Sequence, residues 1–252
     1  MRKLENKVAL VTGASSGIGR AMANTFAKEG ATCIVVDVDQ KGIQEVIDSI
    51  VSQGNNAAVE VCDVGQALEV KQVVAKVLAE YGSIDILVNN AGIMDDFMPA
   101  ADLSLKQWHH VMNVNLHGAF YFCHEILPSM LERGKGVILN ISSVGGLQGA
   151  RAGAAYTASK HGMIGLTKNI AFVYGVKGVR CNAIAPGGVK TNIGASMHPN
   201  AFGYERMMTG TATMPRMAEP EEIAAAALFL VSDDGSFVNG EVLVADGGWT
   251  AY

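Results

Sequence analysis

The sequence predicts an α/β fold, a doubly wound parallel sheet of about seven strands with helices on both faces. Short runs rich in valine and isoleucine recur without polar alternation, which is typical of strands buried on both faces. Segments of helical length separate these runs, and a connection of that length joins parallel neighbours. In such a sheet, ligands bind at the carboxyl ends of the strands.

The predicted elements follow one another in a regular order. The first apolar run ends at Gly13, and the apolar residues after it are spaced near 3.6, so they predict strand, tight turn and helix. This unit then repeats along the chain. The predicted strands cover residues 8–13, 32–38, 57–64, 84–90, 136–142, 179–186 and 241–248, and the predicted helices cover 15–30, 41–54, 67–82, 104–133 and 156–174. The sequence shows neither an internal repeat nor a linker, so we expect residues 1–252 to form a single domain.

The composition restricts the classes of partner. Apolar residues make up 49% of the chain and charged residues 17%, which excludes a disordered protein. A net charge of -5 argues against nucleic acid and against an anionic membrane surface, so we expect a small-molecule substrate. We interpret the four cysteines as reduced core residues of a cytoplasmic protein, because they are far apart and form no C-x-x-C motif. The N-terminal apolar run is too short for a signal peptide, and no run is as long as a membrane span.

A glycine-rich turn follows the first predicted strand. Residues 12–19 read T-G-A-S-S-G-I-G, which places Gly13, Gly17 and Gly19 between the strand and its helix. Glycines let the backbone approach a pyrophosphate, and the helix N-terminus stabilises its charge. The spacing differs from the general G-x-G-x-x-G pattern, but its place directly after a strand is typical of a Rossmann-type dinucleotide-binding fold.

Two acidic residues follow the next strands. Asp37 ends the second strand, where a carboxylate can accept hydrogen bonds from an adenosine ribose and repel a 2′-phosphate. Neither Ser16 nor Val38 supplies a compensating cation, so we expect the cofactor to be NAD rather than NADP. Asp63 follows the third strand, where it either caps the next helix or contacts the adenine ring.

Tyr156 and Lys160 are the candidate catalytic pair. Four residues apart on a helix, they lie on one face. The lysine charge should lower the pKa of the tyrosine, so that the phenol exchanges a proton with an alcohol. Each pKa unit corresponds to about 1.4 kcal/mol, so a shift of several units requires a further charge, such as that of a ligand.

The segment 187–220 is the longest stretch without strong periodicity, and five of the twelve methionines lie in it. Long segments of this kind in compact domains are often functional, and flexible thioethers suit a cover over an apolar ligand. We therefore predict a substrate lid at 187–220, with permanent packing on the core as the alternative.

Several ordered motifs together resemble one family, the classical short-chain dehydrogenases/reductases. The resemblance covers essentially the whole chain. It rests on the glycine-rich turn, Asp63-Val64, N-N-A-G at 89–92, Asn115, Ser143, Y-T-A-S-K at 156–160 and P-G-G-V-K-T at 186–191.

The resemblance implies roles for these residues. Tyr156 is the acid/base, Lys160 lowers its pKa and holds the nicotinamide ribose, Ser143 binds the substrate oxygen, and Asn115 completes a water-mediated proton relay. Asn89 to Gly92 line the adenosine side, and Thr191 holds the nicotinamide carboxamide. The complete set of implied cofactor-binding residues is Gly13, Ser15, Ser16, Gly17, Ile18, Gly19, Asp37, Asp63, Val64, Asn89, Ala91, Gly92, Tyr156, Lys160, Pro186, Gly187, Val189 and Thr191.

No metal is expected. His110, His117 and His124 are spaced by seven on one predicted helix, but residues two turns apart are too distant to chelate one ion by themselves. We interpret them as a packed or subunit-facing stripe. In the family this helix and the one that carries Tyr156 commonly form a tetramer interface, so a homotetramer is implied.

The resemblance thus implies an oxidoreductase that transfers a hydride between a secondary alcohol, or its ketone, and NAD. The alternatives are an activity like that of 3-oxoacyl-(acyl-carrier-protein) reductase or of glucose 1-dehydrogenase, and, more remotely, a nucleotide-binding protein without turnover. Asp37 weighs against the carrier-protein reductases, which usually take NADPH. The apolar lid weighs mildly against a sugar.

Overall fold

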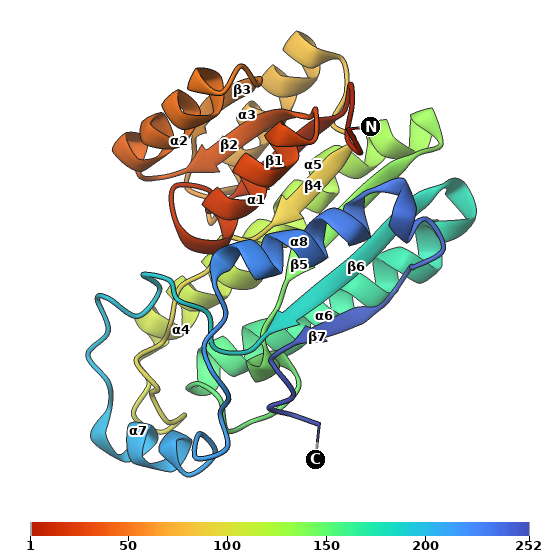
Figure 1. The fold of residues 1–252 in the computed structure, drawn as a ribbon. Helices are drawn as coiled ribbons and strands as arrows, with labels where there is room; N and C mark the ends of the chain where they lie inside the picture. Colours follow the sequence, from red (N-terminus) through yellow and green to blue (C-terminus); the bar gives the residue numbers. More distant parts are fainter. Residues whose placement is uncertain (1, 252) are drawn as a thin grey trace.

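A single parallel sheet organises the molecule, which is a computed structural model that describes residues 2–251 (Figure 1). The strand order is β3-β2-β1-β4-β5-β6-β7. The chain runs outward from β1 to one edge and returns to place β4 on the other side of β1, so the sheet is doubly wound as predicted. The strands are β1 (Val8–Thr12), β2 (Thr32–Asp37), β3 (Ala57–Val61), β4 (Ile86–Asn89), β5 (Gly136–Ile141), β6 (Val179–Pro186) and β7 (Val242–Ala245).

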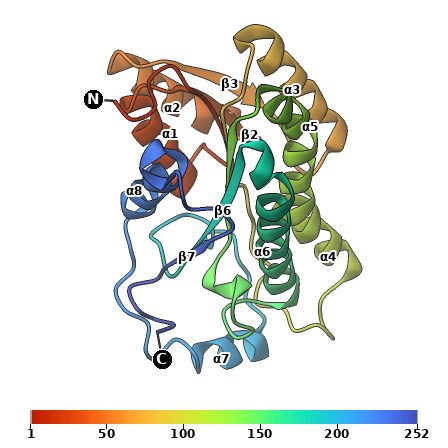
Figure 2. The same ribbon diagram turned by 90° about the vertical axis from the view of Figure 1, so that its right-hand side faces the viewer.

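Helices cover both faces of the sheet (Figure 2). One face carries α1 (Gly17–Lys28), α2 (Gln40–Ser52) and α8 (Pro220–Val231), and the other carries α3 (Ala67–Tyr81), α4 (Leu105–Met112), α5 (Gly118–Arg133) and α6 (Ala154–Tyr174). Helix α7 (Ala201–Met208) lies apart from both layers, at the bottom of Figure 1.

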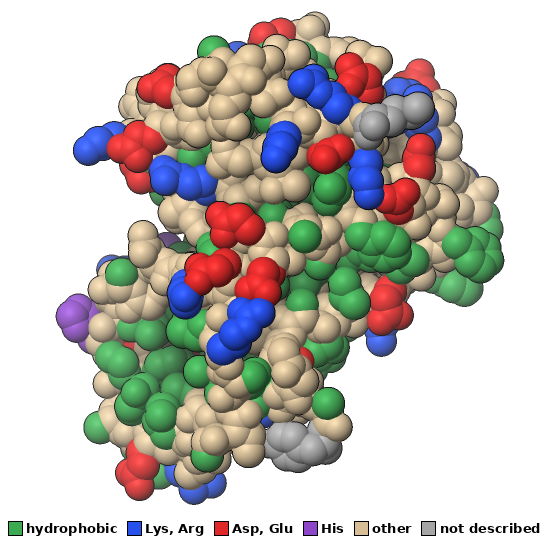
Figure 3. Space-filling model, in the orientation of Figure 1, with side chains coloured by type: hydrophobic (Ala, Val, Ile, Leu, Met, Phe, Trp, Pro, Cys, Tyr) green, Lys and Arg blue, Asp and Glu red, His purple; other side chains and the backbone are tan. Residues whose placement is uncertain are grey.

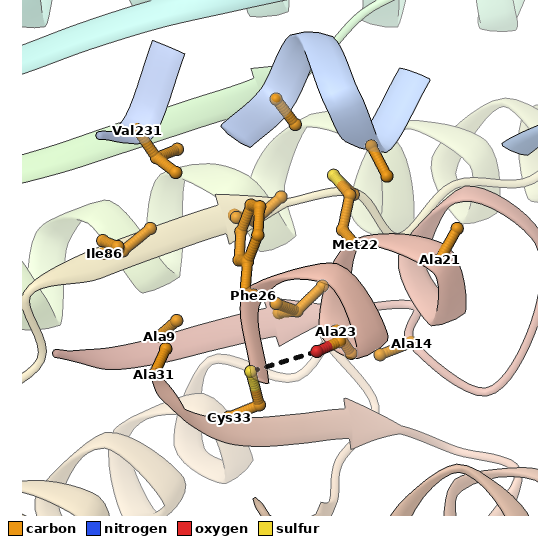
Figure 4. Close-up of a cluster of buried hydrophobic side chains, with 14 of the residues drawn as sticks. Ala9, Ala14, Ala21, Met22, Ala23, Phe26, Ala31, Cys33, Ile86 and Val231 are labelled. Carbon is orange, nitrogen blue, oxygen red and sulfur yellow. Dashed lines mark hydrogen bonds between the residues drawn. The ribbon is translucent and has the colours of Figure 1, made fainter. Parts of the chain in front are cut away.

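The sheet separates two hydrophobic cores. Ala9 and Val11 of β1 face the first core, and Leu10 faces the second, because successive side chains of a strand point to opposite faces. Figure 4 shows the first core, where Phe26 and Met22 of α1 are fully buried. Full burial of one such side chain stabilises the fold by about 1.5–3 kcal/mol. The two cores explain why the inner strands are apolar without alternation.

All four cysteines are free and buried, which confirms their predicted place in the core. The thiol of Cys33 donates to the carbonyl of Ala23 at 3.3 Å, as the dashed line in Figure 4 marks. Burial raises the pKa of the Cys33 thiol to about 12.

The predicted helix at 104–133 is continuous but not uniform. It begins at its N-cap Ser104, whose hydroxyl accepts from the amide of Gln107 at 3.2 Å. Between α4 and α5 the residues Asn113–His117 form a π-helical turn. Such a turn widens the helix locally and often occurs at functional sites.

Helices α7 and α8 lie outside the predicted elements. α7 falls within the predicted lid, and none of its residues is buried, so a strong apolar period was not needed for it to form. α8 is alanine-rich and apolar on most sides, which obscures its period, but its start is well marked. Pro220 occupies its first turn, and Glu219 and Glu222 form a capping box.

Candidate active site

A cavity of about 590 Å³ opens at the carboxyl ends of the central strands. Its volume lies within the usual range for ligand sites. Figure 3 shows the surface indented on its left side, between the first βα unit and the lid segment. The predicted site residues that line the cavity are Gly13, Ser15, Ser16, Gly17, Ile18, Asp37, Asp63, Val64, Ala91, Gly92, Ser143, Tyr156, Lys160, Pro186, Gly187, Val189 and Thr191.

The glycine-rich turn forms one wall of this cavity. Gly13 adopts a left-handed φ of 63°, and a Cβ atom there would lie 2.7 Å from Cα of Ala91. At Gly19 a Cβ atom would lie 2.1 Å from the carbonyl oxygen of Gly13, so the helix can approach the turn only with glycine. Ser16, the N-cap of α1, makes no side-chain cap hydrogen bond. The first amide groups of α1 therefore suit a pyrophosphate, which a helix N-terminus stabilises.

Asp37 lies at the end of β2 in the wall of the cavity. Its carboxylate accepts the amide hydrogens of Ser15 at 3.0 Å and of Asp39 at 3.1 Å. These contacts fix its orientation, and carboxylate oxygens retain further acceptor capacity. Arg20 is the nearby cation that the sequence reasoning missed. Its guanidinium donates to the carbonyl of Ser15 at 3.1 Å and to Glu45 at 3.3 Å.

The structure decides whether Asp63 caps the helix that follows it. It lines the cavity, and its carboxylate accepts the amide of Gly65 at 2.9 Å. The N-cap of α3 is instead Gln66. Asp63 therefore shapes the turn beside the cavity rather than capping the helix.

Ser143, Tyr156 and Lys160 meet inside the cavity although they come from two elements. Ser143 follows β5, where its hydroxyl accepts the amide of Gly145 at 3.0 Å. Tyr156 and Lys160 lie in the first two turns of α6, and they are 8% and 3% exposed. The ammonium of Lys160 donates to the carbonyl of Ile141 at 2.7 Å and lies 5.6 Å from the ring centroid of Tyr156.

The pKa values of this pair are governed by burial. Burial raises the pKa of Tyr156, the hydrogen bond with Ser143 partly opposes this, and the negative charge of Asp95 raises it further. Burial also lowers the pKa of Lys160 to about 8. Lys160 alone therefore does not lower the pKa of Tyr156, which agrees with the expectation that a further charge, such as that of a ligand, is required. The protein by itself favours the neutral phenol, because the effect of burial on the pKa is larger than that of the Ser143 hydrogen bond. The ammonium of Lys160 is directed at a backbone carbonyl rather than at the phenol oxygen.

Asn115 lies in the π-helical turn and is fully buried. Its side-chain oxygen accepts the amide of Ile93 at 2.8 Å, and its nitrogen donates to the carbonyl of Ile93 at 3.0 Å and to the hydroxyl of Ser159 at 3.2 Å. Ser159 in turn donates to the carbonyl of Tyr156 at 2.7 Å. Asn115 thus joins the segment after β4 to the tyrosine helix from behind the cavity wall, and its role in a proton relay stays a prediction.

The structure also places Asn89 and Gly19 behind the cavity wall rather than in it. Asn89 is 3% exposed, and its amide donates to Asn140 at 2.9 Å and to the sulfur of Cys123 at 3.4 Å. The neighbouring Asn90 takes its place and donates to the carbonyls of Thr12 and Gly13. Asn90 lies within the range 89–92 that was expected to line the adenosine side, whereas the sequence reasoning missed the lining residues Val38, Cys62, Ile93, His110, Val114, Ile141, Ser142, Asn192 and Ile193. Most of them directly adjoin predicted residues, so proximity in the chain was the available signal.

The three histidines do not act as one stripe. The π-helical turn ends at His117 and changes the rotation of the helix between His110 and His117. His110 lines the cavity, His117 lies 2.8 Å from the side-chain oxygen of Asn113, and His124 stacks on Phe120. Within residues 2–251 no group of three potential ligands is close enough to hold a metal ion.

The segment 187–220 is joined at its two ends. Val189 pairs with Ala218 in an isolated bridge, and the amides of Lys190 and Ala218 donate across it at 3.0 and 2.9 Å. The segment between these ends leaves the body of the fold and carries α7 (Figure 1). Hydrophobic side chains gather at the lower left of Figure 3, over this segment. Its function as a lid stays a prediction.

Comparison with known proteins identifies the family. A family model described as enoyl-(acyl carrier protein) reductase matches residues 13–250. The 3beta-hydroxysteroid dehydrogenase 2 of Eggerthella lenta is 42% identical over 251 residues, which cover 99% of this chain and 96% of that protein. The cyclohexanol dehydrogenase of an Acinetobacter species is 38% identical, and the match covers 99% of this chain and 97% of that protein. The chain belongs to the short-chain dehydrogenase/reductase family.

Solved structures of the family agree with this fold. A protein of Beutenbergia cavernae, provisionally described as an NAD(P) dependent gluconate 5-dehydrogenase with bound NADP at low occupancy, is similar with a TM-score of 0.90. It is 40% identical, and the match covers 99% of both chains. Members of the short-chain dehydrogenase/reductase family bind a nicotinamide cofactor, so the present chain is an oxidoreductase with a small-molecule substrate. No helix within residues 2–251 has the length and apolar character to span a membrane.

Proposed function

We propose that this short-chain dehydrogenase/reductase transfers a hydride between a secondary alcohol, or its ketone, and NAD, with Tyr156 as the general acid/base. The observation that carries this proposal is the meeting of Ser143, Tyr156 and Lys160 in the wall of one cavity with the glycine-rich turn. Side chains from the turn after β5 and from α6 converge there on a volume large enough for a substrate and part of a dinucleotide.

The residues present fit a dinucleotide. The bound cofactor would supply the hydride acceptor or donor. The first turn of α1 would hold the pyrophosphate, Asp37 the adenosine ribose, and Lys160 the nicotinamide ribose. Gly17 and Thr191 support this placement, because a Cβ atom on Gly17 would lie 3.0 Å from the methyl of Thr191, so the base of the lid rests on the glycine-rich turn.

Tyr156 moves the proton in this proposal. When an alcohol is oxidised, the phenolate oxygen of Tyr156 takes the hydroxyl proton, while the hydroxyl of Ser143 donates to the substrate oxygen. Burial favours the neutral phenol, so the protein alone holds Tyr156 as an acid suited to the reduction of a ketone. Oxidation near neutral pH requires the positive charges of Lys160 and of the oxidised cofactor to oppose the effect of burial.

NAD is proposed over NADP because two backbone amides fix the Asp37 carboxylate in the cavity wall, where it would face the adenosine ribose. Arg20 is a cation held on the same glycine-rich turn, but Glu45 already accepts from its guanidinium. NADP is the second candidate for the cofactor, because the relative from Beutenbergia cavernae contains bound NADP. The negative carboxylate of Asp37 would repel the 2′-phosphate of NADP, unless Arg20 left Glu45 and paired with that phosphate.

The substrate is proposed to be a secondary alcohol on an apolar ring. Ile93 and Ile193 line the cavity, and both side chains are apolar. The names of the relatives from Eggerthella lenta and Acinetobacter, a hydroxysteroid and a cyclohexanol dehydrogenase, support the same class. A panel of cyclohexanol, a 3β-hydroxysteroid, glucose and an oxoacyl thioester, scored by NADH absorbance, tests it. Turnover of the thioester alone would refute the ring alcohol.

The catalytic role is tested by Tyr156→Phe. The ring of phenylalanine fills the same space, so NADH binding measured by fluorescence should stay within about twofold, while turnover should fall by at least about 10³-fold because the proton donor is lost. Undiminished turnover in this variant would refute the mechanism. Turnover in neither protein, with NADH bound by both, would favour the nucleotide-binding protein without catalysis.

A homotetramer is proposed from exposed apolar residues on two sides of the sheet. Phe172 near the end of α6 and Val176 in the turn after it are 87% and 90% exposed, and Phe237 near α8 is fully exposed. Single apolar residues are common on surfaces, but large ones this exposed suit subunit interfaces. Light scattering coupled to size-exclusion chromatography should give a molar mass in solution of four times the 26.5 kDa of one chain. A monomeric mass would refute the assembly.

A further inference from the structure

Asp95 is a fully buried carboxylate that none of the predicted roles explains. It follows the N-N-A-G motif and is 0% exposed. One oxygen accepts the amide of Gly153 at 3.0 Å, and the other accepts the amide of Tyr156 at 2.8 Å. Asp95 therefore joins the loop after β4 to the backbone of the proposed catalytic tyrosine.

The first turn of α6 depends on this contact. Its N-cap residue is Gly153, which has no side chain to accept from the first amides. A Cβ atom at this position would lie 2.5 and 2.6 Å from the two oxygens of Asp95. The carboxylate of Asp95 thus takes the place of a local cap from a distant part of the chain. Burial raises the pKa of this carboxyl, and the backbone amides of Tyr156 and Gly153 at the helix N-terminus partly oppose this by stabilising its charge.

The backbone after Asp95 is held in an unusual conformation. Asp96 and Phe97 have φ values of 56° and 53°, which are uncommon outside glycine. Such residues store backbone strain, which is often found at functional sites. The amide of Ala154 donates to the carbonyl of Met98 at 3.0 Å, so the same turn also holds the start of α6 on its far side.

Asp96 faces the opposite way, toward the lid. Its carboxylate accepts the amide of His198 at 3.0 Å and the side chain of Gln107 at 3.1 Å. Its carbonyl accepts the amide of Asn200, the N-cap of α7, at 2.8 Å. At Gly203 a Cβ atom would lie 1.9 Å from the carbonyl oxygen of Phe97, so α7 packs directly on the turn.

We propose that Asp95 is a positioning residue for Tyr156, and that the strained turn Asp95–Phe97 connects the placement of this tyrosine with that of the lid. Asp95 acts through the backbone of the first turn of α6 and through its charge, without touching the substrate. The inference rests on the proposed role of Tyr156 and adds a residue to it. It predicts that the two neighbouring carboxylates differ in function, Asp95 in the chemical step and Asp96 in substrate binding.

The charge of Asp95 affects the pH at which Tyr156 ionises. A residue with a purely structural role would leave that pH unchanged. The groups that face Tyr156 are Ser143 after β5, Lys160 one turn further along α6, and Asp95 from the loop after β4. The negative charge of Asp95 raises the pKa of Tyr156. Loss of this charge should therefore move the ionisation of Tyr156 to lower pH.

The test compares Asp95→Asn with the matched control Asp96→Asn. Asparagine has the size of aspartate, but one of its two terminal atoms is the nitrogen of an NH2 group. This nitrogen is a donor and faces a backbone N–H donor, so one of the two hydrogen bonds is lost. We expect kcat to fall about 10- to 100-fold with the KM for NADH unchanged, because small displacements of a reacting group have effects of this size. The alkaline midpoint of kcat/KM against pH should move to lower pH. Asparagine tolerates the left-handed conformation, so Asp96→Asn should raise the KM for the ketone and leave the pH profile unmoved.

Two further measurements keep the outcomes separate. The phenolate absorbance of Tyr156 near 295 nm, obtained by subtracting the matching Tyr156→Phe variant, should titrate at lower pH in Asp95→Asn, and it needs no turnover. If the wild-type enzyme turns over no substrate, the proposed function fails while this titration still tests the charge of Asp95. If Asp95→Asn does not fold, Asp95→Glu keeps the charge but displaces it. A kcat equal to that of the wild type in Asp95→Glu, or an unmoved pH profile and titration in Asp95→Asn, would overturn the inference.

Discussion

Replacement of Lys160 by methionine should make the protein lose a pH dependence of stability that the wild type has. Lys160 is 3% exposed, and burial lowers its pKa from the ordinary 10.5 to about 8. The folded protein thus releases this proton at a lower pH than the unfolded chain. Between pH 8 and 10.5 the unfolded chain binds more protons, so this group makes stability rise with pH in that window.

The magnitude follows from the two pKa values. The difference between 10.5 and about 8 corresponds to about 3 kcal/mol over the whole window. Between pH 7 and about pH 9.5, integration gives a gain of about 2 kcal/mol, because the folded lysine is then mostly neutral and the unfolded one is still charged. Methionine fills a similar volume without a charge. It also leaves the carbonyl of Ile141 without its partner, which costs about 1–3 kcal/mol at every pH and so does not affect the slope.

The assay is urea unfolding of both proteins at pH 7 and about pH 9.5, at one protein concentration, with extrapolation to water. The thiols of the unfolded chain also ionise toward alkaline pH, but they are present in both proteins, so their contribution cancels in the difference. The wild type should gain about 2 kcal/mol relative to Lys160→Met between the two pH values. If the two proteins change in parallel, the ammonium of Lys160 is hydrated in solution, and the low pKa assigned to it is incorrect.

Two other predictions concern the cofactor and the thiols. Asp37→Ser should bind NADPH at least about tenfold more tightly relative to NADH, because the repulsion of the 2′-phosphate is removed, and fluorescence titration measures both affinities. Tighter binding of NADPH than of NADH by the wild type would refute the role of Asp37. Burial raises the pKa of Cys33 and Cys123 to about 12, so a thiol-specific chromogenic reagent should react with them only after unfolding, and rapid reaction of the native protein at pH 8 would contradict their burial.

The fold could be predicted from sequence because its inner strands are buried on both faces. Alternate residues of β1 enter different cores, so every position of the strand requires an apolar side chain. The resulting runs predict each strand to within a few residues. Helix α8 shows the reverse case. It packs on α1 but is apolar nearly throughout, so its amphipathic period is weak and only its capping box marks it.

The cavity wall could be predicted because turns at strand ends are local. The glycines of the first turn, Asp37 and Ser143 each lie at or just after the end of a strand, so the topology brings them together. Asn89 shows the limit of this reasoning. The motif places it beside the cavity, but alternate residues of a strand point in opposite directions, and its amide lies on the side of Asn140 and Cys123.

Asp95 could not be recognised because its role depends on a contact across 61 residues of chain. In the sequence it is one of two adjacent aspartates shortly after a glycine, a pattern typical of an exposed turn. The backbone conformation of Asp96 separates the two carboxylates, one into the protein and one toward the lid. Gly153 carries a signal of the same contact, since it begins the tyrosine helix where a capping side chain is usual. A helix that starts at glycine before a candidate catalytic residue therefore predicts a cap from elsewhere in the fold, and a buried carboxylate is the group to seek there.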